Sequence, residues 1–324
     1  MPPTGPAPTV SITIPCYHQL EQAQRCVESV LAQSFTDFDL TLADDGASDE
    51  YRRYVESLRD PRVRYQRNPV RLGAMRNMFQ AIGAGAGKYT VAFHEDDLMG
   101  RDYLRVAVGL LEQHPSCGFV AGELREFQDQ LLPETLEVSG DHPSYVLFGS
   151  PPDFLRGILG GLEPMFGSVV YRRAALDRVV PAHAEYGTLV DRPFLLAIMQ
   201  QWSAAIVRNP LVWYRHHPDN VRHSGMTADH ILHLLTLYRS TLSLPLTPRD
   251  QALFYTYSGY WLFTLYDLTP DDQRPSFRRF LFRAWRGGLY QPKWRGRFGL
   301  RLLQRALFGR GPRAAHAARR RQPV

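Results

Sequence analysis

TVAFHEDDLM at residues 90–99 is the stretch that decides the fold of this chain. Its apolar run, Val91 to Phe93, stops abruptly at the polar residues His94, Glu95, Asp96 and Asp97. This pattern predicts a short buried strand that carries acidic side chains at its carboxyl end. In an open α/β sheet, ligands bind outside the carboxyl ends of the strands. Acids placed there can hold a divalent cation and, through it, a phosphorylated ligand.

A second acidic strand end lies upstream, in DLTLADDGASD at residues 39–49. Leu40 and Leu42 alternate with polar residues before the pair Asp44 and Asp45, and a Gly/Ser turn follows. Two acidic strand ends in one sheet predict a single shared site.

The surrounding chain alternates between strand and helix patterns. A β-branched run at 10–17, stopped by Pro15, predicts the first strand, and helical spacing follows at 20–33. The alternation continues with strands at 38–43, 63–68, 90–93 and 117–122, and with helices around 51–58, 75–82 and 102–113. This order predicts an α/β fold with a doubly wound, mostly parallel sheet flanked by helices.

The later segments are less regular. Residues 128–165 are rich in Pro, Gly and Asp, which predicts a long surface excursion over the site. Strand into helix is expected at 168–176, an amphipathic helix at 190–202, and then a closing strand. From about 226 the pattern is helical and broken into short pieces by aromatics and prolines. We therefore expect one α/β domain at 1–225 and a helical, basic extension at 226–324.

Composition narrows the class of protein. The chain has 324 residues, of which 44% are hydrophobic, so it can bury one large core or two modest ones. Its three cysteines have neither metal-ligand spacing nor a disulfide-rich pattern, which favours a reducing compartment. The first residues lack the pattern of a signal peptide, and no apolar stretch is long enough to span a bilayer. These features predict a cytoplasmic protein.

Charge is unevenly distributed along the chain. Residues 273–324 hold 15 basic residues and no acidic one, which leaves 23 basic and 32 acidic residues in 1–272. The formal net charge is therefore −9 for residues 1–272 and +15 for residues 273–324. An acidic body suits cation binding, whereas the basic segment needs its own explanation.

The basic segment carries an amphipathic pattern in FRRFLFRAWRGGLY at 277–290. One predicted helical face holds Phe277, Phe280, Leu281, Ala284 and Trp285, and the other holds Arg278, Arg279, Arg283 and Arg286. This composition predicts docking on an anionic membrane surface, at the inner face of the cell membrane. Two alternatives stay open: the apolar face packs on the acidic body, or, less favoured, the arginines bind nucleic acid.

Six segments together resemble one enzyme family. They are VSITIPCY, ESVLAQSFTDFDL, ADDGASD, NPVRLGAMRN, GKYTVAFHEDD and YRRAAL, in the family's order and spacing. Over residues 9–222 the chain resembles the family 2 glycosyltransferases with the GT-A fold. The resemblance implies a nucleotide-sugar donor, a divalent metal, and transfer to a hydroxyl group with inversion at the anomeric carbon. It also implies that residues 1–225 form the catalytic domain.

The resemblance assigns donor binding to four residues outside the HEDD motif. Pro15 and Tyr17 match the strand end where the family lays the donor base against the backbone and an aromatic ring. Asp45 matches the acid that reads a pyrimidine edge, which favours a UDP- or dTDP-sugar, and Arg76 matches a basic residue near the base or the diphosphate. The residues themselves allow other roles: Tyr17 as a core or rim aromatic, Asp44 and Asp45 in an Asx-turn, and Arg76 as an exposed helix residue.

The HEDD segment matches the family's Asp-x-Asp signature, with Asp96 as the metal-binding acid. His94 stands where the family has its first Asp, which leaves that role to Glu95, Asp97 or the imidazole. Glu95 is accordingly assigned to donor binding. For Asp97, capping of the helix that starts near Asp102 is an alternative.

A further metal ligand is expected in YRHHPDN at 214–220. The resemblance points to His217 by the family's Arg-x-His spacing, with His216 second. Oxygen ligands and a diphosphate suit Mn²⁺ or Mg²⁺, and an imidazole ligand favours Mn²⁺.

The catalytic base is expected in GTLVDRPFLLAIM, where the family has an acidic pair before a helix. Val190 replaces the first acid, and Asp191 keeps the second. Asp191 would accept the proton of the attacking acceptor hydroxyl. It is also well placed to cap the helix amino terminus.

Two other functions stay open at this stage. Nucleotidyl transfer also uses an acid-held metal on a doubly wound sheet, but IPCYHQLEQ offers no Gly-rich basic loop for a triphosphate. A catalytically silent nucleotide-sugar-binding protein of the same fold is suggested by His94 and Val190. The sequence leaves the sugar and the acceptor open; a lipid-linked or cell-envelope glycan acceptor would fit the expected membrane surface.

Overall fold

The chain forms two compact units, Met1–Met226 and Thr227–Val324. The computed structural model describes residues 7–46, 48–127, 143–177, 179, 182–216, 226–242, 244–269 and 274–291.

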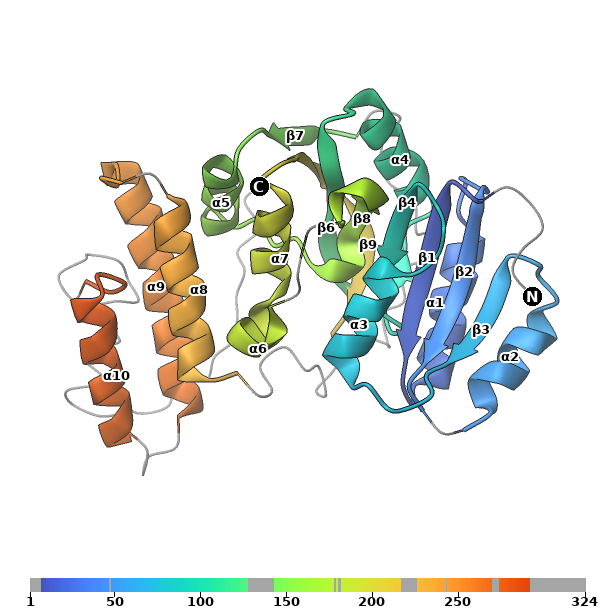
Figure 1. The fold of residues 1–324 in the computed structure, drawn as a ribbon, viewed down its shortest axis with the longest axis horizontal. Coiled ribbons are helices and arrows are strands. Elements are labelled where there is room, and N and C mark those ends of the chain that lie inside the picture. The colour runs from blue at the N-terminus through green and yellow to red at the C-terminus, as the bar shows by residue number, and fades with distance from the viewer. Residues whose placement is uncertain are drawn as a thin grey trace. The chain divides into compact units, whose positions relative to one another are not determined.

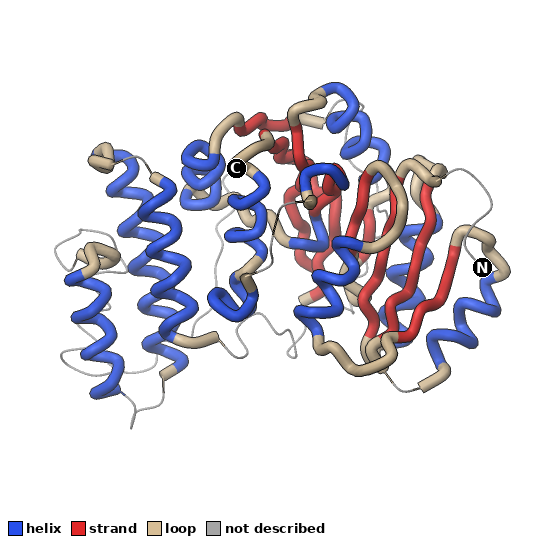
Figure 2. Tube along the Cα trace, in the orientation of Figure 1, coloured by secondary structure: helices blue, strands red, loops and turns tan. Residues whose placement is uncertain are grey.

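The first unit is built on a nine-stranded mixed sheet (Figures 1 and 2). The strands are β1 (Val10–Cys16), β2 (Phe38–Asp44), β3 (Val63–Arg67), β4 (Tyr89–Ala92), β5 (Leu98–Met99), β6 (Cys117–Phe127), β7 (Tyr145–Phe148), β8 (Val169–Arg172) and β9 (Ser203–Arg215). Their order is β3-β2-β1-β4-β8-β6-β9-β5, and β7 pairs with β9. The first four of these run parallel, whereas β8, β5 and β7 are antiparallel to their neighbours.

Helices flank the sheet, with α3 on one face of β1 and α1 on the other (Figure 1). The helices of this unit are α1 (Leu20–Leu31), α2 (Glu50–Leu58), α3 (Ala74–Gly83), α4 (Tyr103–Gln113), α5 (Pro151–Leu159), α6 (His183–Tyr186) and α7 (Asp191–Ile198), with the 3₁₀ turns η1 (Phe166–Ser168), η2 (Arg173–Ala175) and η3 (Gly187–Leu189). The predicted α/β class is confirmed, and its strand–helix alternation is the one expected through β6, except for the two-residue strand β5, which was not predicted. Apart from β5, the strands that run antiparallel to their neighbours, β7 and β8, follow β6 in the chain.

The central strand β1 explains why a site opens at the carboxyl edge. Val10, Ile12 and Ile14 on one face and Ser11 and Thr13 on the other are almost fully buried, as expected for a strand covered on both faces. The ladder to β4 reaches the bond from Phe93 N–H to the Thr13 carbonyl oxygen (2.9 Å). Pro15 comes next on that side of β1 and has no N–H to donate, so the two strands part beyond this point.

The predicted surface excursion at 128–165 is wrong for its second half. Residues 128–142 lie outside the described part, but β7 pairs with β9, and α5 buries Phe154 against Phe119 at 5.6 Å between ring centroids. The Ser150 hydroxyl caps α5 by accepting the Asp153 N–H, and two prolines fill the first helical positions. The Pro-rich composition therefore marks a helix start, because proline is well suited to the first turn.

Two adjacent arginines of YRRAAL hold helix ends away from the site. The Arg172 guanidinium donates to the carbonyl oxygens of Leu111 (2.6 Å), in the last turn of α4, and Cys117 (2.8 Å), at the start of β6. Arg173 donates to those of Ala84 (2.8 Å) and Gly87 (2.7 Å), just after α3. Carbonyl groups at helix carboxyl ends lack partners within the helix, so these cations satisfy them and fix both helices.

The second unit is helical, with α8 (Ala228–Thr241), α9 (Pro248–Leu268) and α10 (Arg274–Arg286). Thr227 and Thr247 cap α8 and α9 by accepting the N–H groups of His230 and Asp250. The expected short pieces are wrong for α9, which runs for 21 residues because Pro248 stands at its start. Among the helices described, none combines the length and apolarity needed to span a bilayer.

Candidate functional site

Several of the predicted site residues converge where β2, β1 and β4 end side by side. Cys16 pairs with Asp44 across β1 and β2, and the Asp45 N–H donates to the Cys16 carbonyl oxygen at 3.0 Å. On the other side, β4 delivers the HEDD segment next to the end of β1. The structure thus brings Tyr17, Asp45 and HEDD to one edge of the sheet.

Glu95 joins the HEDD segment to the loop after β1. Its carboxylate accepts the Tyr17 N–H at 2.8 and 3.0 Å and the Tyr51 hydroxyl at 2.6 Å. The same hydroxyl accepts the Gln19 N–H at 2.9 Å. Burial raises the pKa of Glu95 to about 7, although the hydrogen bonds from Tyr51 and Tyr17 oppose the shift. Glu95 therefore fixes the loop in which His18 adopts a φ of 58°.

Tyr17 lies partly exposed in that loop, between two other side chains. Its ring meets His18 edge-on at 4.2 Å, and the Arg71 guanidinium lies 4.3 Å from its centroid. Arg71 was missed by the sequence reasoning, which selected Arg76, an exposed residue in the first turn of α3. The position of Arg71 in the turn leading into a helix at the site was the available signal. Pro15 is partly exposed at the end of β1.

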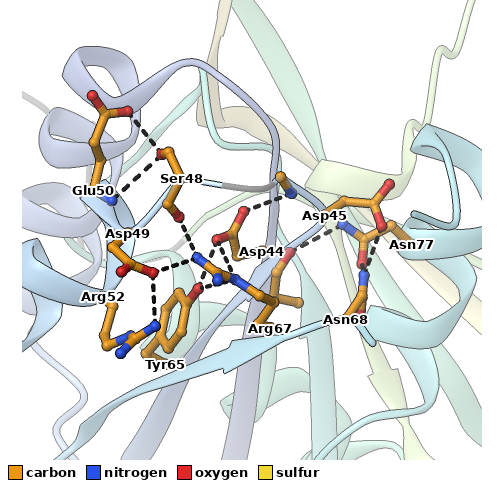
Figure 3. A network of polar contacts seen from close by, with 12 residues as sticks. Asp44, Asp45, Ser48, Asp49, Glu50, Arg52, Tyr65, Arg67, Asn68 and Asn77 are labelled. Atoms are coloured by element: carbon orange, nitrogen blue, oxygen red, sulfur yellow. Dashed lines mark hydrogen bonds and ion pairs between the residues drawn. The ribbon is translucent and has the colours of Figure 1, made fainter. Parts of the chain in front are cut away.

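Asp45 is buried and anchors the turn before α3. Its Oδ1 accepts the Leu72 N–H (2.7 Å) and the Asn68 amide (3.0 Å), and its Oδ2 accepts the Gly73 N–H (2.7 Å). Burial alone would raise the pKa of Asp45, but these hydrogen bonds and the Arg71 charge lower it. Figure 3 places Asn68 and Asn77 beside Asp45. This amide network was not predicted.

Asp44 is fully buried, and its carboxylate has partners different from those of the Asp45 carboxylate (Figure 3). Its Oδ1 accepts the Gly46 N–H at 2.8 Å, which is the Asx-turn considered for this pair. Its Oδ2 accepts the Tyr65 hydroxyl at 2.7 Å, and Arg67 lies at 3.7 Å. The Asx-turn thus belongs to Asp44, whereas Asp45 binds the next turn of chain.

His94, Asp96 and Asp97 gather potential ligand atoms within 4.8 Å of one another. His94 Nδ1 lies 3.1 Å from Asp97 Oδ2, and the Arg215 N–H donates to Asp97 Oδ1 at 3.0 Å. Asp97 does not cap α4, whose N-cap is Asp102. Asp96 stays partly exposed. Two carboxylates and an imidazole are a donor set that fits a divalent cation.

The charges of this cluster act on one another. Burial disfavours the imidazolium form of His94, but the hydrogen bond to Asp97 and the charges of Asp97, Asp96 and Asp191 outweigh it and raise its pKa. Burial likewise raises the pKa of Asp97, opposed by His94. Gly167 packs against the imidazole so closely that an added Cβ would lie 3.3 Å from Nδ1.

Asp191 is the first residue of α7, after the buried Val190 at the N-cap position. Its Oδ1 accepts the N–H of the next residue, Arg192, at 2.8 Å, and α7 has no side-chain cap. The predicted capping role is therefore wrong. Burial raises the pKa of Asp191, opposed by the charges of Arg192 and His94. A carboxylate with a raised pKa is a stronger base.

The end of β9 is bound to the HEDD segment. Arg215 is buried, and its Nε donates to the Asp96 carbonyl oxygen at 2.7 Å. His216 follows with an exposed side chain, and its N–H donates to the Phe127 carbonyl oxygen. His217 lies outside the described residues, so its place in the metal site stays a prediction.

Solved structures share this arrangement of elements. TarS residues 1–349 of S. aureus, in complex with UDP-GlcNAc, superimposes with a TM-score of 0.60 at 14% identity, covering 84% of this chain and 79% of that one. The mannosyltransferase PcManGT of Pyrobaculum calidifontis, in complex with GDP-Man and Mn²⁺, gives a TM-score of 0.52 at 16% identity, covering 94% and 88%. At identities this low, the likeness shows a shared fold alone, and that fold is GT-A.

Sequence relatives match part of the chain. WcaA of Escherichia coli strain K12, a candidate glycosyl transferase of colanic acid biosynthesis, is 32% identical over 92 residues, 28% of this chain and 33% of that protein. A chondroitin synthase of Escherichia coli is 33% identical over 105 residues, 31% of this chain and 15% of that protein. The chain thus spans a third or less of the length of these two relatives. Residues 11–175, half of the chain, match the family described as glycosyl transferase family 2. The chain belongs to glycosyl transferase family 2.

Proposed function

We propose that the chain transfers a sugar from a nucleotide-diphosphate donor to a hydroxyl acceptor, with inversion and with the help of a divalent cation. The observation that carries the proposal is the meeting of Tyr17, Asp45 and the cluster of His94, Asp96 and Asp97 at one sheet edge. Family membership supports the reaction class. We assign the catalytic domain to 1–225 and the helical extension to 226–324.

For the donor we favour a UDP- or dTDP-sugar. Asp45 Oδ2 accepts one N–H, from Gly73, and a carboxylate oxygen can accept a second hydrogen bond. The imide N–H of uracil or thymine is such a donor, with Tyr17 and Arg71 beside it to cover the base and Arg76 near the diphosphate. TarS binds UDP-GlcNAc and PcManGT binds GDP-Man, so the test below includes both nucleotides.

For the cation we favour Mn²⁺ or Mg²⁺, held by Asp96 and completed by His217. When bound, the ion neutralises charge on the departing diphosphate. Asp97 has both oxygens in hydrogen bonds to His94 and Arg215, so its contribution is to orient these neighbours. Glu95 supports donor binding indirectly, through the backbone of Tyr17.

The proposed base is Asp191. The acceptor oxygen forms a bond to the anomeric carbon, and its proton passes to the Asp191 carboxylate. The bond from that carbon to the diphosphate oxygen breaks, and the nucleoside diphosphate leaves with the electron pair. Attack on the face opposite the leaving group inverts the configuration. The raised pKa of Asp191 favours this proton transfer.

A screen of donors tests the proposal. Thermal unfolding is followed with UDP-glucose, UDP-GlcNAc, dTDP-glucose and GDP-mannose, each with Mn²⁺, with Mg²⁺ and with chelator. A ligand that binds only the folded chain adds about 2.7 kcal/mol at a hundred times its Kd. We expect stabilisation by a uridine or thymidine donor that chelator abolishes, together with slow release of nucleoside diphosphate from that donor.

Other outcomes identify the rival functions. A chain that binds the donor but neither hydrolyses it nor transfers the sugar to any of a panel of glycan and lipid-linked acceptors would be a silent binding protein. The replacements His94 and Val190 suggest this alternative. Turnover of a nucleoside triphosphate with a sugar phosphate would mark a nucleotidyltransferase. Stabilisation by none of the donors contradicts the proposal.

A further inference from the structure

Helix α10 buries the apolar residues that the sequence assigns to a membrane. Phe277, Phe280, Leu281 and Ala284 are all less than a tenth exposed. The Phe277 ring contacts Tyr266 of α9 edge-on at 5.1 Å between centroids. The predicted interfacial stripe is therefore wrong for these four positions, because their side chains are buried within the folded chain.

A different face of α10 remains exposed and aromatic. Phe282 and Trp285 are 54% and 51% exposed, and their ring centroids lie 5.7 Å apart. Single exposed hydrophobic residues are common on proteins, but a contacting pair of large rings on one helix is an apolar patch. The sequence pattern places Trp285 on the apolar face together with the four buried residues, and it places Phe282 outside that face.

Cations surround this aromatic pair. Arg279, Arg283 and Arg286 are exposed, and with Phe282 they follow the three- and four-residue spacing of one helix face. The Arg286 guanidinium lies 5.9 Å from the centroid of the Phe282 ring. No acidic residue occurs after Asp272, so every formal charge on α10 is positive.

We propose that this face of α10, formed by Phe282, Trp285, Arg279, Arg283 and Arg286, docks on an anionic lipid bilayer. Aromatic rings beside cations match the two layers of such a surface: the rings enter the headgroup region, and the guanidinium groups meet lipid phosphates. The basic composition of the whole segment 273–324 likewise favours a negatively charged partner. Nucleic acid would attract the cations equally, but exposed apolar ring area at the centre of the face favours lipid.

Vesicle flotation tests the proposal with the full chain. Vesicles of phosphatidylcholine alone are compared with vesicles that also contain phosphatidylglycerol. We expect the chain to float with the anionic vesicles at low salt and to be released as salt rises. Replacing both aromatics, Phe282→Ser with Trp285→Ser, should abolish flotation. Arg283→Gln with Arg286→Gln should weaken it about 30-fold, since each cation near the surface contributes roughly a fivefold factor.

The matched control is Tyr260→Ser, which removes an exposed aromatic from α9 (44% exposed) and should float like the parent chain. Trp fluorescence adds a second measurement: anionic vesicles should shift the emission to the blue, and Trp285→Phe should remove that shift while retaining flotation. Thermal unfolding checks that each variant folds. Flotation of the double aromatic variant at the parent level overturns the proposal. A lower Kd of the parent chain for RNA than for anionic vesicles, measured at the same salt concentration, also overturns it. Donor-dependent stabilisation should be unchanged in all variants, so this test is independent of the proposed activity.

Discussion

At the scale of single residues, neighbouring acids with similar sequence contexts have different roles. Asp44 and Asp45 are adjacent, yet one closes an Asx-turn and binds Tyr65, and the other holds the turn before α3. In the HEDD segment, Glu95 binds the loop of Tyr17 while Asp96 stays partly exposed. The identity of an acid does not specify its role, because backbone direction at a strand end sends successive side chains to opposite sides.

The exposed acid is the one whose loss should affect the cation. We expect Asp96→Ala to remove the metal-dependent stabilisation by donor, about 2.7 kcal/mol at a hundred times Kd, because the ion loses a direct oxygen ligand. Thermal unfolding with donor and Mn²⁺ measures it. Glu112→Ala, which removes a surface acid paired with Lys88, is the control and should behave like the parent. Unchanged donor affinity in Asp96→Ala at saturating Mn²⁺ contradicts the metal assignment.

Asp191 can be tested by a nearly isosteric change. Asp191→Asn keeps the size of the side chain and its bond from the Arg192 N–H, but it removes the basic carboxylate. We expect transfer to fall by roughly two to four orders of magnitude with donor affinity little changed. Rates at saturating acceptor measure the effect, with the exposed Asp153→Asn as control. Near-normal turnover would mean that another residue is the base.

Asp45 should contribute to stability in a pH-dependent way. Its carboxylate accepts two backbone N–H groups and an amide, so Asp45→Asn should cost about 1–3 kcal/mol of unfolding free energy at pH 7. Its folded-state pKa lies below the ordinary value of about 3.9, so this contribution is present above that pH and is lost as pH falls through the lowered pKa. Urea unfolding at neutral and acidic pH should show the difference between parent and variant shrinking in acid. A stability difference between parent and variant that is the same at neutral and acidic pH contradicts this role of the Asp45 carboxylate.

At the scale of elements, the sequence predicts regular strands and helices well and long-range pairing poorly. The patterns at β1, β2 and α4 predict those elements within about one residue of their observed ends, because each carries a clear period of two or of 3.6. The antiparallel placement of β8 depends on which strands meet it across the sheet, and no local pattern encodes that. Arg71 was missed although it lies in the turn leading into α3, because its contact with Tyr17 joins two turns that are distant in the sequence.

The loop after β1 depends on a helix that follows β2. Tyr51 of α2 donates to Glu95 and accepts the Gln19 N–H, so Tyr51→Phe should leave that N–H without its partner and loosen the loop. We expect a loss of about 1–3 kcal/mol in stability and several-fold weaker donor binding, measured by calorimetry. The control is Tyr54→Phe in the same helix, whose hydroxyl makes one long bond of 3.4 Å. Equal effects of the two changes would contradict a positioning role for Tyr51.

At the scale of the whole molecule, charge and chemistry are divided between the two ends of the sequence. The acidic first 272 residues contain the GT-A fold and the candidate site, and the following basic segment contains α10. The sequence predicts this division from charge counts alone. It could not predict which face of α10 is exposed, because an amphipathic pattern marks an apolar stripe without saying what covers it.

The two consecutive arginines where β8 ends and η2 begins have a consequence for how such a chain can change in length. Arg172 and Arg173 are consecutive, so one short segment, the end of β8 and the start of η2, sets the positions of both α3 and α4 at the edge of the sheet away from the site. An inserted or deleted residue there would displace two helices at once. Length variation among natural variants should therefore concentrate in the loops at the opposite edge, where new acceptors can be accommodated while the frame stays intact.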